Sequence, residues 1–130
     1  MSESPYTFSE ALAAARRAAQ AQQAGEQAVR DAASDLAEKE RGYRVALARK
    51  IVEVHADGAA WTVAQDLARG DQAVADLRYH RDVATGVLEA AQQRAWRHTA
   101  DRKDVLEFIQ WSRRRELAEN GAHGPLEAVA

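Results

Sequence analysis

The sequence predicts an all-α protein built as a long antiparallel two-helix hairpin, and three observations lead to this class. The 130 residues include 30 alanines and only two prolines, and they are otherwise rich in Glu, Arg, Gln and Leu, which is a composition typical of long helices. Only 6% of the residues are aromatic, which is too little bulk for a compact core of this length. Two proline-free stretches of similar length flank one turn near the middle of the chain.

The first arm is expected from about residue 8 to residue 55. Thr7 and Glu10 have the spacing of a capping box, in which each side chain accepts a hydrogen bond from the other residue's backbone amide. Three acid–base pairs at the favourable four-residue spacing support the helix surface: Glu26/Arg30, Asp35/Lys39 and Glu40/Arg44. Gly25 and Gly42 each cost on the order of 1 kcal/mol relative to alanine, so either glycine is a candidate position for a bend or a break.

The tip of the hairpin is expected over residues 56–70. Asp57-Gly58 ends the first arm, because glycine suits the left-handed residue that follows a last helical turn. Thr62 and Gln65 have the spacing of a second capping box, for a short helical segment that ends at Gly70. Trp61 directly precedes this cap, so it either packs at the tip or stands out as a docking residue.

The second arm is expected from about residue 71 to residue 119, with Asp71 as its cap and Asn120-Gly121 and Gly124-Pro125 as its end. Apolar residues recur along it in three- and four-residue steps, the pattern of a coiled-coil seam: Val74, Leu77, Ala84, Leu88, Ala91, Ala95, Val105 and Ile109. Arg81, His98 and Arg102 fall on the same stripe and weaken it. Arms of equal length around a symmetric tip predict that facing residue numbers add up to about 127, which sets Leu47 opposite His80.

A lone hairpin buries too little apolar surface to offset the entropy of ordering about 100 residues. Several large apolar residues also lie partly off the seam and need cover: Val45, Ile51, Val52, Val54, Val83, Val87 and Phe108. The sequence therefore predicts a single helical domain over residues 1–130, with frayed ends at 1–6 and 122–130, that pairs as a homodimer into a four-helix bundle. A three-helix monomer with a break at Gly42 is the alternative architecture.

No signature of catalysis, cofactor binding or metal binding is present in the sequence. It has no Gly-rich phosphate loop, no HExxH and no nucleophile elbow, and it has no cysteine. His80 and His98 return to one helix face but lie about 27 Å apart along a helix, so they cannot share a metal ion. The net charge of −2 argues against a globally basic nucleic-acid binder. No apolar run reaches membrane-spanning length, and we expect a cytoplasmic protein without an enzymatic activity.

Arginine and tryptophan gather in the second half of the second arm, a combination used at protein interfaces and on nucleic acid. The pairs Arg97/Asp101 and Lys103/Glu107 also fit an ordinary solvated helix face. We therefore weigh a solvated face, a protein partner and nucleic acid, in that order. Together with Trp61, the candidate contact residues are Arg94, Trp96, Arg97, Arg102, Trp111, Arg113, Arg114 and Arg115. A helix-turn-helix interpretation of the tip is not favoured, because Asp66 occupies the small-residue position and the following helix is too long.

Residues 43–119 resemble small α-helical proteins of actinobacterial phages and prophages, through the phrases DLARGDQAVADLRYHRDVA, AWRHTADRKDV and FIQWSRRRELAE. The 15 arginines against three lysines agree with such a source. The resemblance implies a phage or prophage origin and, with it, a location in the cytoplasm of the host cell. It supplies no catalytic residues. We expect a non-enzymatic interaction or adaptor protein acting on a host or phage protein. The alternatives are an accessory factor in phage DNA replication or recombination, and a virion-assembly scaffold or chaperone.

Overall fold

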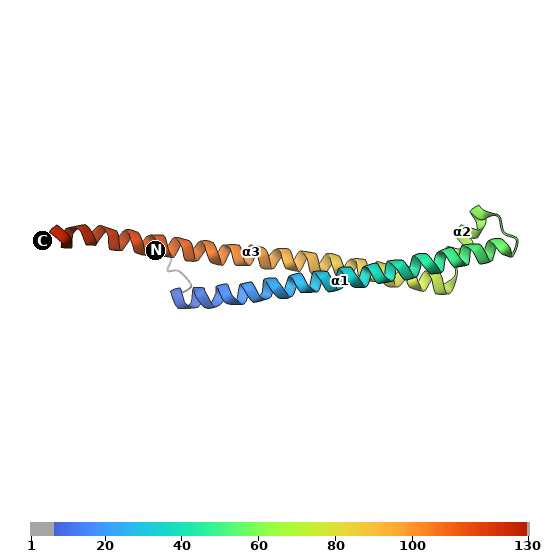
Figure 1. Cartoon of the computed structure of the whole chain (residues 1–130), viewed down its shortest axis with the longest axis horizontal. Coiled ribbons are helices and arrows are strands. Elements are labelled where there is room, and N and C mark those ends of the chain that lie inside the picture. The colour runs from blue at the N-terminus through green and yellow to red at the C-terminus, as the bar shows by residue number, and fades with distance from the viewer. Residues whose placement is uncertain (1–6, 130) are drawn as a thin grey trace. The chain divides into compact units, whose positions relative to one another are not determined.

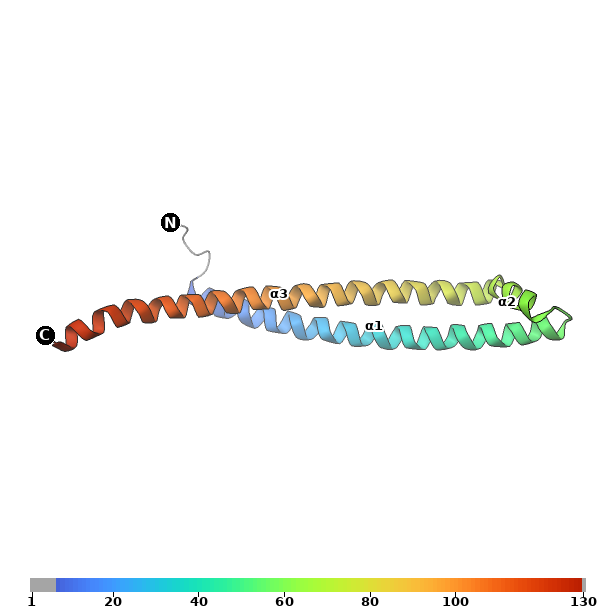
Figure 2. The same cartoon turned by 90° about the horizontal axis from the view of Figure 1, so that it is seen from above.

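The computed structural model describes the backbone of residues 7–129 and the side chains of residues 7–121. It contains three helices over this range, α1 (Phe8–Ala56), α2 (Trp61–Arg69) and α3 (Gln72–Val129), as Figure 1 shows. The long helices α1 and α3 pack against each other in opposite directions (Figure 2), which confirms the all-α hairpin. They contribute to two compact units: a tip unit, Glu26–Gln93, which includes α2, and a terminal unit, Met1–Gly25 with Arg94–Ala130.

The start of α1 confirms the predicted capping box. The backbone amide of Glu10 donates to the Thr7 hydroxyl at 3.2 Å, and the amide of Thr7 donates to the Glu10 carboxylate at 2.8 Å. Two amides that the first turn cannot satisfy are thereby paired. The predicted N-terminal frayed segment, residues 1–6, lies outside the described residues.

Helix α1 passes through Gly25 and Gly42 without a break, so the three-helix alternative is wrong. Each glycine weakens the helix by only about 1 kcal/mol, and the residues around Gly42 supply local support. Lys39 pairs with Asp35 at 2.6 Å and Arg44 pairs with Glu40 at 2.7 Å, as expected. The third expected pair does not form in the described residues, because Arg30 donates instead to the Gln27 amide oxygen at 2.9 Å.

The end of α1 is a Schellman motif, which confirms the role predicted for Gly58. Gly58 has a φ of +110°, and its amide donates to the His55 carbonyl at 3.0 Å while the Ala59 amide donates to Val54 at 3.3 Å. Both bonds satisfy carbonyls of the last turn that have no partner within the helix. Nδ1 of His55 lies 2.8 Å from the Ala59 carbonyl, so the side chain fastens the same turn.

The predicted capping box at Thr62 and Gln65 is wrong. Helix α2 begins earlier, at Trp61, with an extended Ala60 as its N-cap and no side-chain hydrogen bond to the cap. The Ala60 carbonyl accepts from the Ala64 amide at 2.8 Å, and Trp61 stacks on His55. These contacts fix the entry of the chain before Thr62, which therefore lies inside the helix and has no free first-turn amide to cap.

Helix α3 has the predicted cap but not the predicted end. The carboxylate of Asp71 accepts from the Val74 amide at 3.3 Å, after Gly70 ends α2 in a right-handed conformation. The end at about residue 119 is wrong, because α3 continues to Val129. Asparagine and glycine end a helix when a left-handed residue captures the last carbonyls, and among the described residues only Gly58 has a positive φ. Gly121 is accommodated in the helix at a modest cost in free energy.

The predicted register of facing residues is also wrong, by about one helical turn or more. In the tip unit, Lys50 lies 3.5 Å from Asp71 and Glu40 lies 3.5 Å from Arg81, so facing residue numbers add up to 121. In the terminal unit, Gly25 lies against His98, not Val29 as the symmetric tip implied. The cause is an asymmetric tip: α1 runs six residues past Lys50, whereas α3 starts directly after Asp71. The nine-residue α2 fills the difference.

The seam between the helices consists mostly of small residues. Val74 and Ala84 are buried at the predicted three- and four-residue steps. The buried apolar residues among those described are Ala11, Ala32, Tyr43, Ala64, Ala68, Val74 and Ala84. The helices approach each other closely at Gly25, since a Cβ added there would lie 3.3 Å from the His98 ring. The seam is therefore narrow and buries little apolar surface.

Candidate interaction surfaces

The tip surface is built on α2. The Trp61 and His55 rings stack with their centroids 3.7 Å apart and 15° between their planes. Trp61 is nevertheless 54% exposed, and Val63 and Leu67 are exposed to a similar extent. Because Ala64 and Ala68 occupy the buried side of α2, the larger apolar residues of this helix remain at the surface. Trp61 thus packs on the tip and still leaves about half of its surface exposed.

Arg81 is held inside the seam of the tip unit by three groups. Its guanidinium contacts Asp82 at 2.9 Å and Glu40 at 3.5 Å, and it lies 4.7 Å from the centroid of the Tyr43 ring. The hydrogen bond to Asp82 is the first cause that raises the pKa of Arg81, and it outweighs the opposing effect of burial. Arg81 interrupts the apolar pattern of the seam in the sequence, but in the structure its charge is paired with carboxylates and an aromatic ring.

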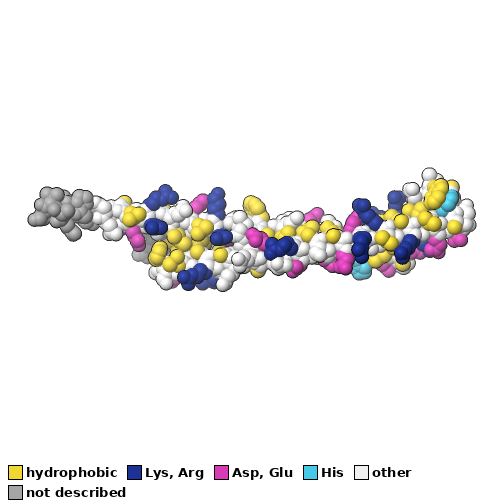
Figure 3. Space-filling model, viewed as in Figure 1, with side chains coloured by type: hydrophobic (Ala, Val, Ile, Leu, Met, Phe, Trp, Pro, Cys, Tyr) yellow, Lys and Arg dark blue, Asp and Glu magenta, His cyan; other side chains and the backbone are white. Residues whose placement is uncertain are grey.

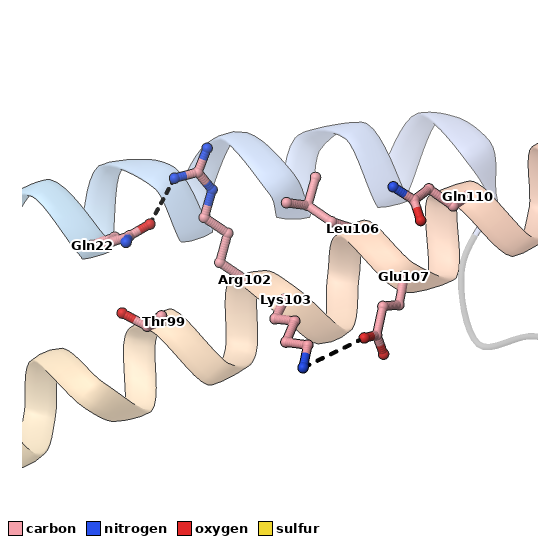
Figure 4. Close-up of a pocket in the computed structure, with 7 residues that line it drawn as sticks. All are labelled: Gln22, Thr99, Arg102, Lys103, Leu106, Glu107 and Gln110. Atoms are coloured by element: carbon pink, nitrogen blue, oxygen red, sulfur yellow. Dashed lines mark hydrogen bonds and ion pairs between the residues drawn. The ribbon is translucent and has the colours of Figure 1, made fainter.

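The basic residues of the terminal unit do not form one cluster. Arg102 is turned into the seam, where its guanidinium donates to the Gln22 amide oxygen at 2.7 Å. Figure 4 shows this bond beside an open groove of about 500 Å³, which is lined by Gln22, Thr99, Arg102, Lys103, Leu106, Glu107 and Gln110. Lys103 lies at the rim and pairs with Glu107 at 3.9 Å. Arg102 is thereby less available to a partner than the exposed arginines of the same helix.

The exposed candidates lie on the outer side of α3. Trp96 is 73% exposed and is flanked by the exposed Arg94 and Arg97. The side chains of these three residues make no hydrogen bond or ion pair with other described residues. The expected Arg97–Asp101 pair is absent there as well. Since Trp96, Lys103 and Arg114 recur at seven- and eleven-residue spacing, they share one helix face.

Trp111 and Arg115 form a local contact that the sequence does not single out. The Arg115 guanidinium lies 5.5 Å from the centroid of the Trp111 ring and also pairs with Glu119 at 3.2 Å. Trp111 in turn lies 6.1 Å from Phe108 between ring centroids, and it is 51% exposed. The four-residue spacing of Trp111 and Arg115 is the signal that predicts such a stack on a helix.

Three exposed apolar residues form a stripe on α3 in the tip unit, and the sequence predicts two of them. The off-seam residues Val83 and Val87 are 47% and 53% exposed, as their positions predict, and Tyr79 joins them at 65%. The three residues follow a four-residue spacing and therefore lie on one face. The exposed Asp76 lies three residues before Tyr79 on the same face. The four-residue spacing of Tyr79, Val83 and Val87 is the feature of the sequence that predicts the complete stripe.

Figure 3 shows basic, acidic and apolar side chains interspersed on the face it presents, without one continuous basic patch. Within the described residues, no three His, Cys, Asp or Glu side chains are grouped so that they could hold a metal ion. No helix of the described part of the chain is long and apolar enough to cross a membrane. No protein-family model, curated protein or solved structure matches this chain.

Proposed function

We propose that this chain is a non-enzymatic helical interaction protein of phage or prophage origin, which self-associates and acts on a protein partner in the host cytoplasm. One observation carries the proposal: large apolar side chains lie outside rather than inside. Fifteen large apolar residues among those described are at least 36% exposed, whereas only Tyr43 and Val74 among the buried apolar residues are larger than alanine. Exposed apolar surface on this scale marks interaction sites.

Aromatic and arginine residues support a protein partner in particular. Trp96 stands between Arg94 and Arg97, and tryptophan and arginine are the residues most enriched among those that dominate binding energy at protein interfaces. Trp96 is 73% exposed, so its large ring is accessible to such a partner. The resemblance of residues 43–119 to phage proteins supports the origin and the compartment.

Site-directed photo-cross-linking tests this proposal. A photoreactive phenylalanine analogue placed at Trp96 or at Tyr79 should give discrete cross-linked species in host cells, identified by mass spectrometry. The control is the same analogue at Gln27, an exposed polar position on α1, which should give none. Equal cross-linking at all three positions, or none at any of them, would contradict a specific interface.

Contact with nucleic acid is the second candidate, because Arg113 and Arg114 are exposed and make no ion pair with other described residues. Binding through such residues requires a salt-sensitive shift of DNA or RNA in a gel. Changing Arg113 and Arg114 to glutamate should abolish that shift, and the same changes at Arg44 and Arg49 of the tip unit serve as control. A shift that persists in the Arg113/Arg114 variant would remove these residues from the proposal.

A further inference from the structure

Gly42 leaves a groove beside the seam of the tip unit. The groove has a volume of about 300 Å³ and a mainly apolar surface, and a Cβ added at Gly42 would meet nothing within 4 Å. Leu77 belongs to the predicted seam, yet it is 36% exposed because the glycine beside it has no side chain to cover it. Six residues from both long helices line the groove: Asp35, Glu38, Lys39 and Gly42 of α1, with Leu77 and His80 of α3. The groove therefore spans α1 and α3 on one side of the tip unit.

Exposed valines extend this groove in both directions. Val45 follows Gly42 by three residues and shares its face of α1. On α3, Val83 and Val87 share the face of His80 for the same reason. Because the helices are antiparallel, Val45 extends the groove toward the tip and the other two valines extend it away from the tip. Facing residue numbers that add up to 121 place Val45 about 16 Å from Val87 along the axis, or about three helical turns. We refer to the groove and the three valines as the Gly42 strip.

The rim of the Gly42 strip carries unpaired negative charge. Glu38 lines the groove and Asp76 shares the α3 face; both are exposed and make no ion pair with other described residues. Lys39, the cation of the lining, is already paired with Asp35 at 2.6 Å. Arg49 shares the α1 face but lies one turn beyond the end of the strip, toward the tip. The tip unit as a whole has nine basic and twelve acidic residues, a formal net charge of −3. The rim therefore favours a partner with positive charge.

We propose that the Gly42 strip binds a basic amphipathic helix of another protein. The helix inserts one large apolar side chain over Gly42 and places lysine or arginine against Glu38 and Asp76. An apolar strip about three turns long fits a helix with anchors at positions i, i+4 and i+7. A groove of about 300 Å³ is at the lower limit of small-molecule pockets, so it suits one side chain of a partner better than a whole ligand. This inference rests on the protein partner in the proposed function and specifies the chemistry of that partner.

Selection from a library of random peptides tests this chemistry. Peptides of about 20 residues, long enough to form a helix on binding, are selected by mRNA display on the full chain at about 0.15 M salt. We expect the enriched peptides to carry large apolar residues at three- and four-residue spacing, flanked by lysine and arginine, and to become helical when bound. No enrichment, or enrichment of acidic or non-helical peptides, overturns the inference.

Two matched pairs of variants locate the binding of the selected peptides. Gly42→Leu fills the groove and gains helix propensity, so the chain should stay folded and the peptides should bind at least about tenfold more weakly. Its control, Ala37→Leu, adds the same side chain at an exposed position on the other side of α1 and should leave the affinity unchanged. Glu38→Lys should weaken binding, whereas Glu89→Lys, on the face of α3 opposite His80, changes the net charge equally and should have little effect. Equal effects within either pair overturn the inference.

Failure of this inference is distinguishable from failure of the proposed function. A partner cross-linked from Trp96 whose binding does not change in Gly42→Leu leaves the interaction function intact and removes the Gly42 strip from it. Selected peptides that require Gly42, without any cross-linked protein in host cells, support the strip and contradict the proposed cellular role. Dimerisation of the wild-type chain that Gly42→Leu abolishes would make a second copy the occupant of the strip, and would overturn its assignment to another protein.

Discussion

Replacing Gly25 and Gly42 separately by alanine tests the closeness of the helices in the terminal unit. Both glycines lie inside α1, so each substitution gains helix propensity of about 1 kcal/mol. Their surroundings differ. A Cβ at Gly42 would meet nothing within 4 Å, whereas a Cβ at Gly25 would lie 3.3 Å from the His98 ring and 3.5 Å from Ala95.

The structure therefore predicts different effects of the two alanine substitutions on the free energy of unfolding. Gly42→Ala should stabilise the protein by close to the full propensity gain, about 1 kcal/mol, or roughly 4 °C in Tm for a domain of this size. At Gly25 the ring of His98 must move by a few tenths of an ångström, or the helices must separate. We expect this strain to cancel the propensity gain for Gly25→Ala. The larger Gly25→Leu should cost about 1–3 kcal/mol through overpacking.

Urea unfolding followed by circular dichroism at 222 nm measures these differences, with Gly42→Leu as the matched control for size. Comparison of the midpoints is meaningful if the slope with urea concentration is unchanged. Equal stabilisation by Gly25→Ala and Gly42→Ala would refute the reasoning, since it would mean that no close approach exists at Gly25. A well-tolerated Gly25→Leu would refute it more strongly.

Three further substitutions address the tip unit, each read by the same unfolding assay. Gly58→Ala should destabilise the protein by about 1 kcal/mol, because a φ of +110° is unfavourable for a residue with a Cβ; no change would argue against the Schellman turn. Tyr43→Ala should cost about 3 kcal/mol, since Tyr43 is 7% exposed and lies under Arg81; a cost typical of surface residues would contradict its burial. The pKa of Lys50 is raised above 10.5, first by its hydrogen bond to Glu53 and then by the charge of Asp71, so its contribution is present below 10.5 and lost as pH rises through the raised value. The stability difference between wild type and Lys50→Met should therefore vanish at high pH, and a constant difference would contradict an ionic contribution.

The sequence predicted the features that depend on local chemistry. Thr7 and Glu10 form their capping box, Asp71 caps α3 and Gly58 adopts a positive φ, because each depends on residues within a few positions. The three- and four-residue steps that expose Val83 and bury Ala84 also follow from helix geometry alone. The sequence alone could not show whether two of the candidate contact residues, Trp61 and Trp96, pack against the chain or face solvent.

The predictions that were wrong concern features that depend on contacts between residues far apart in the sequence, or on contacts that compete with one another. The register required knowledge of how far α1 continues past Lys50, which is decided by the packing of α2 and not by the length of either arm. The start of α2 at Trp61 was missed because its stack on His55 competes with the capping signal of Thr62. Arg102 was grouped with the exposed arginines, yet its helix position equally predicted a seam residue. Only its bond to Gln22 across the seam distinguishes the two.

The composition of the seam explains why so much apolar surface lies outside. The distance between two packed helices is set by the side chains at their contact, and here these are mainly alanine, with Gly25 close to His98. Close helices leave little room for large side chains between them beyond Tyr43 and Val74, so residues such as Val87 and Trp96 remain on the outer faces. An alanine seam is in turn too weak in apolar burial to stabilise a hairpin of this length by itself. The proposed self-association would cover these outer faces, so substituting the exposed side chains should weaken assembly and stability together.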